Sequence, residues 1–315
     1  MKEQSIKYLL GKGCENLRTM SNQKTASQYA KNTAKFAAWL CVQGVKRPSQ
    51  LERKYGGYTA AIQAYGDYLS DEGKTASTVH TYLAACCVAA GVDLKDIRKP
   101  KRITSSNIRS RNTGKNERAE KEAESGRYDD LIAFQEMVGI RRAELARLTG
   151  ADLVTDESGH TCVLVKKGKG GKAQLQRILP EHEDFVRSYF DGSNKRLFSI
   201  YDMKNHLDLH ALRAKHAQAA YRYYTSLDDQ GREQLRKELA ERYIAAAKNP
   251  DKVGAWLKEL DKDGGLYRLR GGSRRLAIRK GLPLEYDRLA LMATSVYFLS
   301  HWRLDVTVSN YMLSV

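Results

Sequence analysis

Residues Cys162–Leu179 read CVLVKKGKGGKAQLQRIL and differ in pattern from the rest of the chain. Two apolar runs, Cys162–Val165 and Leu175–Leu179, flank a turn that is rich in glycine and lysine. This arrangement is typical of a β-hairpin. Most other segments space their apolar residues three or four apart, as on one face of a helix. We therefore expect an α+β fold that is mainly α, with a small β-sheet.

The N-terminal part of the chain predicts a helical bundle over residues 21–95, preceded by a separate N-terminal segment, residues 1–20. The stretches with helical spacing are Lys24–Gly44, a segment that begins after Pro48 and Ser49, Tyr58–Leu69 and Ser77–Ala90. A glycine stands at the end of two of these stretches, where glycine commonly terminates a helix. The apolar faces would pack together as a small bundle.

A basic segment, residues 96–120, follows the expected bundle. Between Lys95 and Arg118 the only acids are Asp96 and Glu117, and the remaining residues are mostly basic or small and polar. We interpret this segment as an extended linker, which either is a plain tether or lies along a phosphate backbone. The linker's DNA-binding candidates are Lys99, Lys101, Arg102, Arg109 and Arg111.

Residues 121–315 predict a second domain in which helices surround the hairpin. We expect helices over Arg127–Leu148, from about His182 onward, and over Asp228–Lys248, which carries charges of both signs. The segment Leu266–Gly281 holds six basic residues and no acid. Further DNA-binding candidates are Lys172 in the hairpin turn and, in the basic segment, Arg274, Arg275 and Arg279.

Composition restricts the classes of function. The chain has 54 Lys and Arg against 37 Asp and Glu, a formal net charge of +17. This surplus favours a polyanionic partner, because neutralising phosphates releases counterions, although a merely solvated basic surface is the alternative. A hydrophobic fraction of 42% excludes a disordered chain. We expect no membrane span and see no secretory signal, and five cysteines without zinc-like spacing favour free thiols in the cytoplasm.

Four short segments of the second domain together suggest a chemistry. They are Gly139–Leu145 (GIRRAEL), Gly168–Lys172 (GKGGK), His210–Arg213 (HALR) and Leu299–Trp302 (LSHW), with Tyr311 ten residues beyond the last histidine. In their order and residue types these segments resemble the tyrosine recombinase (phage integrase) family. The pattern G-x-R-x-x-E-L places the first arginine of the resemblance at Arg141 rather than at its neighbour.

The resemblance implies a set of site residues and a domain organisation. The implied catalytic residues are Arg141, Lys169, His210, Arg213, His301 and Tyr311, with Glu144 in a supporting role. Residues 21–95 would be the core-binding DNA domain and residues 121–315 the catalytic domain. Because His210 and His301 stand farther apart than is usual in the family, we expect an insertion at about residues 221–281, which either contacts DNA or serves as a scaffold.

The residue types suit the reaction that the resemblance implies. Two guanidiniums can hold the negative charge that develops on a phosphate under attack. A phenol, with a pKa of about 10, needs a base to become a nucleophile. By resemblance, that base is His210, Tyr311 forms a 3′-phosphotyrosine, Lys169 protonates the departing 5′-oxygen and His301 binds the phosphate. No metal or cofactor is required.

The implied partners are double-stranded DNA, three further copies of the chain in a homo-tetramer on paired sites, and an excision factor. A mobile-element integrase is the favoured interpretation. A cellular recombinase that resolves DNA dimers would share its chemistry, and a catalytically silent DNA-binding regulator would share only the fold. The glycine-rich turn does not fit a P-loop, because Lys166 and Ala173 break its pattern. His206 and His210 lack the further ligands of a zinc site.

Overall fold

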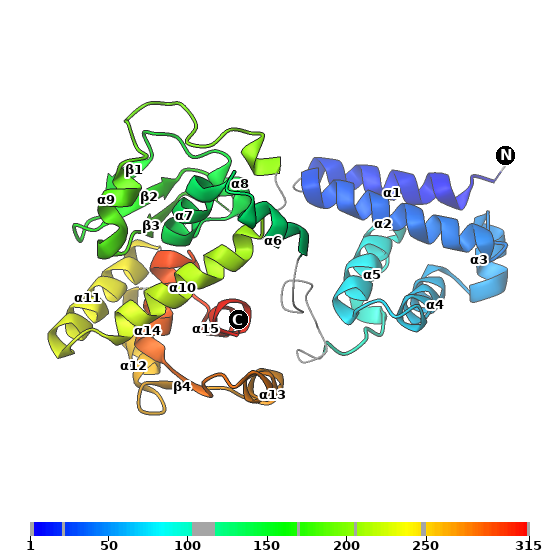
Figure 1. Cartoon of the computed structure of the whole chain (residues 1–315). Helices are drawn as coiled ribbons and strands as arrows, with labels where there is room; N and C mark the ends of the chain where they lie inside the picture. The colour runs from blue at the N-terminus through cyan, green and yellow to red at the C-terminus, as the bar shows by residue number, and fades with distance from the viewer. Residues whose placement is uncertain are drawn as a thin grey trace. The chain divides into compact units, whose positions relative to one another are not determined.

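The computed structural model describes residues 3–20, 23–102, 117–168, 171–204, 207–246 and 250–313. The chain divides into two compact units, Met1–Asn107 and Ile108–Val315. Each unit has its own hydrophobic core, and the two are described separately below (Figure 1). Lys169, Arg109 and Arg111, three residues singled out in the sequence, lie outside the described residues.

The first unit is a bundle of α-helices. Its elements are α1 (Ile6–Met20), α2 (Gln23–Val42), α3 (Pro48–Tyr55), α4 (Tyr58–Asp71), α5 (Ala76–Ala90) and the short 3₁₀ turn η1 (Leu94–Asp96). The bounds of α2, α4 and α5 agree with the predicted helices to within two residues. Helix α1 was not expected from the sequence, yet it packs on both α2 and α5.

Helix α1 belongs to the core of the bundle. Its residues Ile6, Leu10 and Cys14 recur at every fourth position and are buried in one cluster with the other helices. A Cβ atom at Gly13 would lie 2.0 Å from the carbonyl oxygen of Ala89, so only glycine permits so close a crossing of α1 and α5. The bundle therefore includes most of residues 1–20, which we expected to form a separate N-terminal segment.

The second unit combines helices with two small antiparallel sheets. Before the sheet come α6 (Glu117–Glu124), α7 (Asp129–Val138) and α8 (Arg142–Leu145). The sheet and the segment after it contain β1 (Leu153–Thr155), β2 (Thr161–Val165), β3 (Gln174–Arg177), η3 (Pro180–His182), α9 (Glu183–Arg187) and η4 (Asp202–Lys204). The rest of the unit contains α10 (Leu209–Thr225), α11 (Asp229–Ala245), η5 (Pro250–Lys252), α12 (Val253–Asp261), β4 (Leu266–Arg268), α13 (Gly271–Lys280), β5 (Glu285–Asp287), α14 (Arg288–Ala293), η6 (Thr294–Phe298), α15 (Leu304–Thr307) and η7 (Val308–Met312).

The predicted hairpin is present as β2 and β3. The two strands pair antiparallel with Val163 opposite Gln176, and β1 extends the sheet on the other side of β2. At the hairpin turn, the amide of Gly168 donates to the carbonyl of Lys172 at 2.8 Å. Val163 is fully buried because β2 is the central strand and lies against the core of the unit.

The single helix predicted over Arg127–Leu148 is wrong, because the chain breaks it in two. Helix α7 ends at Val138, and Gly139 adopts a left-handed conformation with φ of 61°. A Cβ atom at Gly139 would lie 2.3 Å from Cδ2 of His216 on α10. The apolar periodicity continues past this point, but the helix cannot, since α10 occupies the space that a side chain at Gly139 would need.

Helix α10 is central to the second unit. It contacts α7, α14, η6 and η7, which come from both ends of the unit's sequence (Figure 1). Four of its residues are fully or almost fully buried: Arg213, His216, Ala217 and Ala220. A central helix with two buried polar side chains positions functional groups well, because its backbone is fixed by packing on several sides.

The described residues of the segment that we expected to be an insertion between the two histidine motifs form α11, α12, β4 and α13. It starts after α10 ends at Thr225, a few residues later than expected. Strands β4 and β5 form their own two-stranded sheet, with Tyr267 opposite Tyr286. Leu235 and Leu239 of α11 are buried in the same cluster as the α14 residues, so part of the insertion is packed into the core of the unit.

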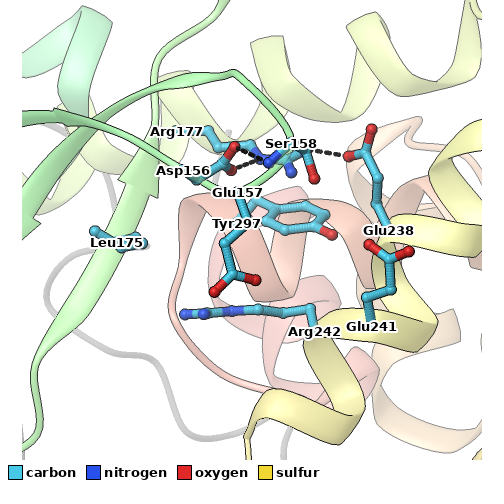
Figure 2. Close-up of a pocket in the computed structure, with 9 residues that line it drawn as sticks. All are labelled: Asp156, Glu157, Ser158, Leu175, Arg177, Glu238, Glu241, Arg242 and Tyr297. Carbon is cyan, nitrogen blue, oxygen red and sulfur yellow. Dashed lines mark hydrogen bonds and ion pairs between the residues drawn. The ribbon is translucent and has the colours of Figure 1, made fainter.

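A buried ionic cluster fastens α11 to the three-stranded sheet. Arg177 of β3 donates to Asp156 at 2.8 Å and to Glu238 of α11 at 2.6 Å, and its guanidinium carbon lies 3.7 Å from the ring centre of Tyr297. Figure 2 shows these four side chains together in the lining of a pocket. We refer to Asp156, Arg177, Glu238 and Tyr297 as the Arg177 cluster.

Candidate active site

Arg141 is the residue immediately before α8, two positions after the break at Gly139. Its guanidinium Nη1 donates to Glu144 Oε1 at 2.7 Å, and its backbone amide donates to Glu144 Oε2 at 3.0 Å. The Glu144 side chain is only 3% exposed, whereas that of Arg141 is 29% exposed. The buried Glu144 carboxylate therefore holds the Arg141 side chain in place, while part of that side chain stays exposed to solvent.

Arg213 lies on α10 and is almost completely buried, at 1% exposure. Its Nη1 donates to the carbonyl of Gly139, and its Nη2 donates to the carbonyl of Leu299 at 3.1 Å. Arg141 Nη2 approaches the same Leu299 carbonyl at 3.4 Å. Burial and the neighbouring Arg141 lower the pKa of Arg213. Since arginine has a very high pKa, two cationic guanidiniums are held side by side.

Tyr311 covers Arg213. Its hydroxyl oxygen lies 3.4 Å from Arg213 Nε, and the residue is 6% exposed. The Tyr311 carbonyl accepts a hydrogen bond of 2.8 Å from Gln218 Nε2 on α10. Both predicted histidines lie nearby, with ring centres 5.4 Å (His210) and 6.4 Å (His301) from that of the tyrosine. Tyr311 thus lies beside three other predicted site residues, Arg213, His210 and His301, of the same chain.

His301 follows a sharp change of chain direction. Ser300 has a positive φ of 55°, which is uncommon for a residue other than glycine, and the His301 amide donates to Ser295 at 2.9 Å. Burial, followed by the positive charges of Arg213 and Arg141, lowers the pKa of His301 to about 4. The ring is therefore neutral at pH 7. Its Nε2 is buried without a hydrogen-bond partner among the described residues, so it is available to a ligand.

Two π-helical turns lie on either side of His301 in the sequence, and the second contains Tyr311. The turn η6 precedes His301, and the turn η7 contains Tyr311. A hydrogen bond between the buried hydroxyls of Ser295 and Thr307 joins η6 to the helix that leads into η7. π-Helical turns are rare in proteins and occur frequently at functional sites.

His210 stands in the first turn of α10, where Asp208 caps the helix. The Asp208 carboxylate accepts hydrogen bonds from the amides of His210 and Ala211 at 3.2 and 3.1 Å. This cap fixes the start of α10, and with it the direction from which the His210 ring approaches Tyr311. The cap is worth roughly 1 kcal/mol to the helix by general experience.

The structure distinguishes Arg141 from its neighbour Arg142. Arg142 is not a freely exposed residue, because its guanidinium donates to the carbonyls of Met203 at 2.9 Å and Leu207 at 2.5 Å. It thereby holds the segment that leads into α10. Only Arg141 is directed toward Arg213 and the Leu299 carbonyl, as the spacing of the motif had implied.

The DNA-binding candidates within the described residues are dispersed on the surface. Lys99, Lys101 and Arg102 are exposed at the end of the first unit, and Lys172 is exposed in the hairpin turn. Arg274, Arg275 and Arg279 are exposed on α13. Their exposure agrees with a surface role, while their function stays a prediction.

Two residues that support the site were not found from the sequence. Gln135 of α7 is fully buried and donates to the carbonyls of Ile140 and Leu209, at 2.6 and 3.0 Å. It therefore ties the Arg141 loop to the start of α10. His216 fills the space beside Gly139, and burial, followed by the charge of Arg213, lowers its pKa to about 3. A glutamine on an otherwise apolar helix face was the available signal for the first of these.

Comparisons with known proteins add little to this geometry. No protein-family model matches the chain. No curated protein matches it either. A solved structure described as the crystal structure of XerA recombinase is similar over 77% of this chain and 99% of its own, with 18% sequence identity and a TM-score of 0.24. At this level of similarity, function has to be inferred from the residues of the site.

Among the described residues, no group of three or more His, Cys, Asp or Glu side chains could hold a metal ion. None of the helices within the described ranges is long and apolar enough to cross a membrane.

Proposed function

We propose that this protein is a tyrosine recombinase, which cuts and rejoins DNA strands through a 3′-phosphotyrosine intermediate. The observation that supports this most is the position of Tyr311. Its hydroxyl lies on Arg213, which shares the Leu299 carbonyl with Arg141, and two histidine rings lie beside the phenol. A phenol, two guanidiniums and two imidazoles in one place suit attack on a phosphodiester.

In the proposed reaction, a DNA phosphate binds the two guanidiniums and His301 Nε2. Arg213 and Arg141 stabilise the charge that grows on the non-bridging oxygens during attack. His301 donates a hydrogen bond as a neutral imidazole, since the amide of Arg303 approaches its Nδ1 at 3.4 Å and the ring proton is therefore assigned to Nε2. To admit the phosphate, the Tyr311 hydroxyl leaves Arg213 Nε and turns toward the phosphorus.

The proton and bond changes balance without an external energy source. His210 accepts the phenol proton as the bond from the Tyr311 oxygen to phosphorus forms. The bond from phosphorus to the 5′-oxygen breaks, and Lys169 supplies the proton for that oxygen. The phosphotyrosine retains the energy of the broken ester, so a 5′-hydroxyl of another strand can reverse the step. No ATP and no water nucleophile take part.

Within this class, we propose a cytoplasmic mobile-element integrase that acts as a homo-tetramer on paired DNA sites, with an excision factor as a further partner. The first unit would be the core-binding domain, and the basic linker would join the two units along the duplex. The positive net charge of +17 and the exposed basic residues support DNA as the partner. An excision-factor gene next to this gene would favour the integrase over a dimer-resolving recombinase.

Covalent capture tests the proposal. The protein is incubated with duplexes that carry the sequences flanking its gene and contain a nick close to the cleavage site, so that the short fragment released with a 5′-hydroxyl diffuses away. We expect a protein–DNA adduct whose attached peptide contains Tyr311. Tyr311→Phe should abolish the adduct, whereas Tyr201→Phe, at a 74% exposed tyrosine, should not. DNA binding without any adduct would contradict the recombinase and favour the silent regulator.

A further inference from the structure

Helix α13 is the part of the insertion that reaches the tyrosine segment. It forms the connection between β4 and β5, and the amide of Leu269 closes the base of this connection on the carbonyl of Leu284 at 2.9 Å. In Figure 1, α13 lies beyond β4, apart from α11 and α12. None of the sequence motifs of the candidate active site includes it.

The outer face of α13 carries uncompensated positive charge. Arg274, Arg275 and Arg279 are exposed, and none has an ion-pair partner within the described parts of the chain. By contrast, Arg232 and Arg236 of α11 each bind an aspartate. Acidic residues therefore neutralise other arginines of the insertion, whereas the arginines on the outer face of α13 keep their positive charge.

The inner face of α13 contacts the segment that carries Tyr311. Ala277 is fully buried in one cluster with Tyr311, Met312 and Leu313. Lys280, at the end of α13, donates to the carbonyl of Leu313 at 3.1 Å. Helix α13 therefore has two different faces. One is basic and exposed, and the other packs on the segment Tyr311–Leu313.

We propose that α13 is a DNA-docking helix that couples binding of the duplex backbone to the position of Tyr311. The occupant is DNA because the face carries basic residues and no acid, and because a duplex whose phosphate reaches Tyr311 must pass close to a helix attached at Leu313. A ten-residue helix is about 15 Å long, the length of roughly four base pairs, and can meet several phosphates. Ile278, 53% exposed among the arginines, would contact sugars or base edges.

The coupling follows from the closed state of the site. Arg213 is unavailable while Tyr311 covers it, so a movement of the tyrosine segment must accompany phosphate binding. DNA that draws α13 outward would act on this segment through Lys280 and the shared apolar cluster. The coupling rests on the proposed function, whereas the docking of DNA on α13 is also supported by the basic face of the helix alone.

The docking is tested by the salt dependence of DNA binding. Fluorescence anisotropy with a mixed-sequence duplex of about 30 base pairs measures the slope of log K against log salt concentration. The triple variant R274A/R275A/R279A should lower the magnitude of this slope by about 0.9 for each lost phosphate contact, or up to about 2.7. Using the Tyr311→Phe background prevents covalent capture from entering the measurement.

A matched variant controls for charge alone. Lys237, Lys252 and Lys258 are exposed cations of α11, η5 and α12, so K237A/K252A/K258A removes the same charge from the same insertion. We expect this control to retain nearly the parental slope. Equal slopes for the two triple variants would overturn DNA docking on α13. A specific loss in the α13 variant would support docking even if no covalent adduct were ever found.

Amide hydrogen exchange tests the coupling without using catalysis. In the parental protein, saturating duplex should increase exchange over residues 304–313. The α13 triple variant, saturated with the same duplex, should show little of this increase. Lys280→Met removes the bond to Leu313 and should raise exchange in the free protein about fivefold, the factor expected for one hydrogen bond. Unchanged exchange in both the DNA-bound parent and the free Lys280→Met variant would overturn the coupling.

Discussion

The hydroxyl oxygen of Tyr311 lies 3.4 Å from Nε of Arg213 in the same chain. This contact places the proposed nucleophile at the position where a DNA phosphate would have to bind. In the proposed reaction, the site of the free protein is therefore closed, and DNA must displace the phenol before the phenol can attack. A conformational step of this kind precedes the chemistry in many enzymes.

Substitution by lysine should lower the free energy of unfolding more at Arg213 than at Arg141. Arg213 bonds two carbonyls from within the core, which a single ammonium cannot replace, so Arg213→Lys should lower the free energy of unfolding by about 2 kcal/mol or more. Arg141 is partly exposed and bonds one carboxylate, so Arg141→Lys should cost less than about 1 kcal/mol. Urea denaturation measures both values, and equal losses would contradict this assignment. Both variants should form the DNA adduct more slowly.

Two buried histidines should make the second unit sensitive to acid. The pKa of His301 is lowered to about 4 and that of His216 to about 3, mainly by burial. Above pH 6.5 both are neutral whether the chain is folded or unfolded. Between pH 6.5 and their folded pKa values, only the unfolded chain takes up the protons, so stability falls as the pH falls. Urea denaturation between pH 7.5 and 4 should show this loss.

The contribution of one histidine can be isolated by substitution. His301→Gln should reduce the pH dependence of the unfolding free energy by up to about 1.4 kcal/mol per pH unit, the value for one proton. Lys204→Gln replaces a surface cation and should leave the slope as it is. A parental slope in His301→Gln would show that this histidine is not held neutral by the fold.

The Arg177 cluster should be a strong structural link between the sheet and the insertion. Burial opposes ionisation of Glu238, but hydrogen bonds with His160 and Arg177 outweigh it and lower the pKa of Glu238 to about 2. Glu238→Gln should therefore cost about 2–3 kcal/mol near pH 7. Glu241→Gln, at an exposed acid of the same helix, should change stability by less than about 0.5 kcal/mol.

Acid should remove the effect of Glu238. Because its folded pKa lies below the ordinary value of 4.5, its ionisation stabilises the fold above pH 4.5, and this stabilisation is lost as the pH falls toward 2. The stability difference between the parent and Glu238→Gln should therefore shrink over this range. Denaturation curves in which the difference stays constant would show that the carboxylate is not ionised in the fold.

Gly139→Ala should be far more damaging than the same change at another left-handed glycine. Gly139 has a φ of 61°, and a Cβ atom there would meet the His216 ring. Gly91 has a φ of 69°, but no atom lies within 4 Å of its Cβ position. We expect Gly91→Ala to cost about 1 kcal/mol and Gly139→Ala roughly 3 kcal/mol or more. Thermal denaturation of the pair checks this, and equal costs would argue against the packing explanation.

Local patterns in the sequence predicted most of the individual elements. Helical spacing followed by a glycine located α2 and α5, and two apolar runs around a glycine-rich turn located β2 and β3. Motif spacing also selected Arg141 over Arg142. These features depend on residues that are near one another in the chain, so a single sequence is sufficient to recognise them.

Features that depend on distant residues could not be predicted in this way. The helix break at Gly139 is enforced by His216 on another helix, while the apolar periodicity runs straight through it. Arg177 and Glu238 pair across 61 positions, and neither stands in a recognisable motif. The closed position of Tyr311 likewise depends on the packing of η7 on α10 and was not predicted.

The π-helical turn around Tyr311 has a consequence for how this site could change in evolution. Such a turn contains one residue more than the α-helical register requires, and each residue of an α-helix rotates the chain by about 100°. Deletion of a single codon between Val308 and Asn310 would therefore swing the phenol away from the guanidiniums. The basic outer surfaces would be unchanged, so under the proposed function one mutational event would leave a protein that binds DNA but no longer cleaves it.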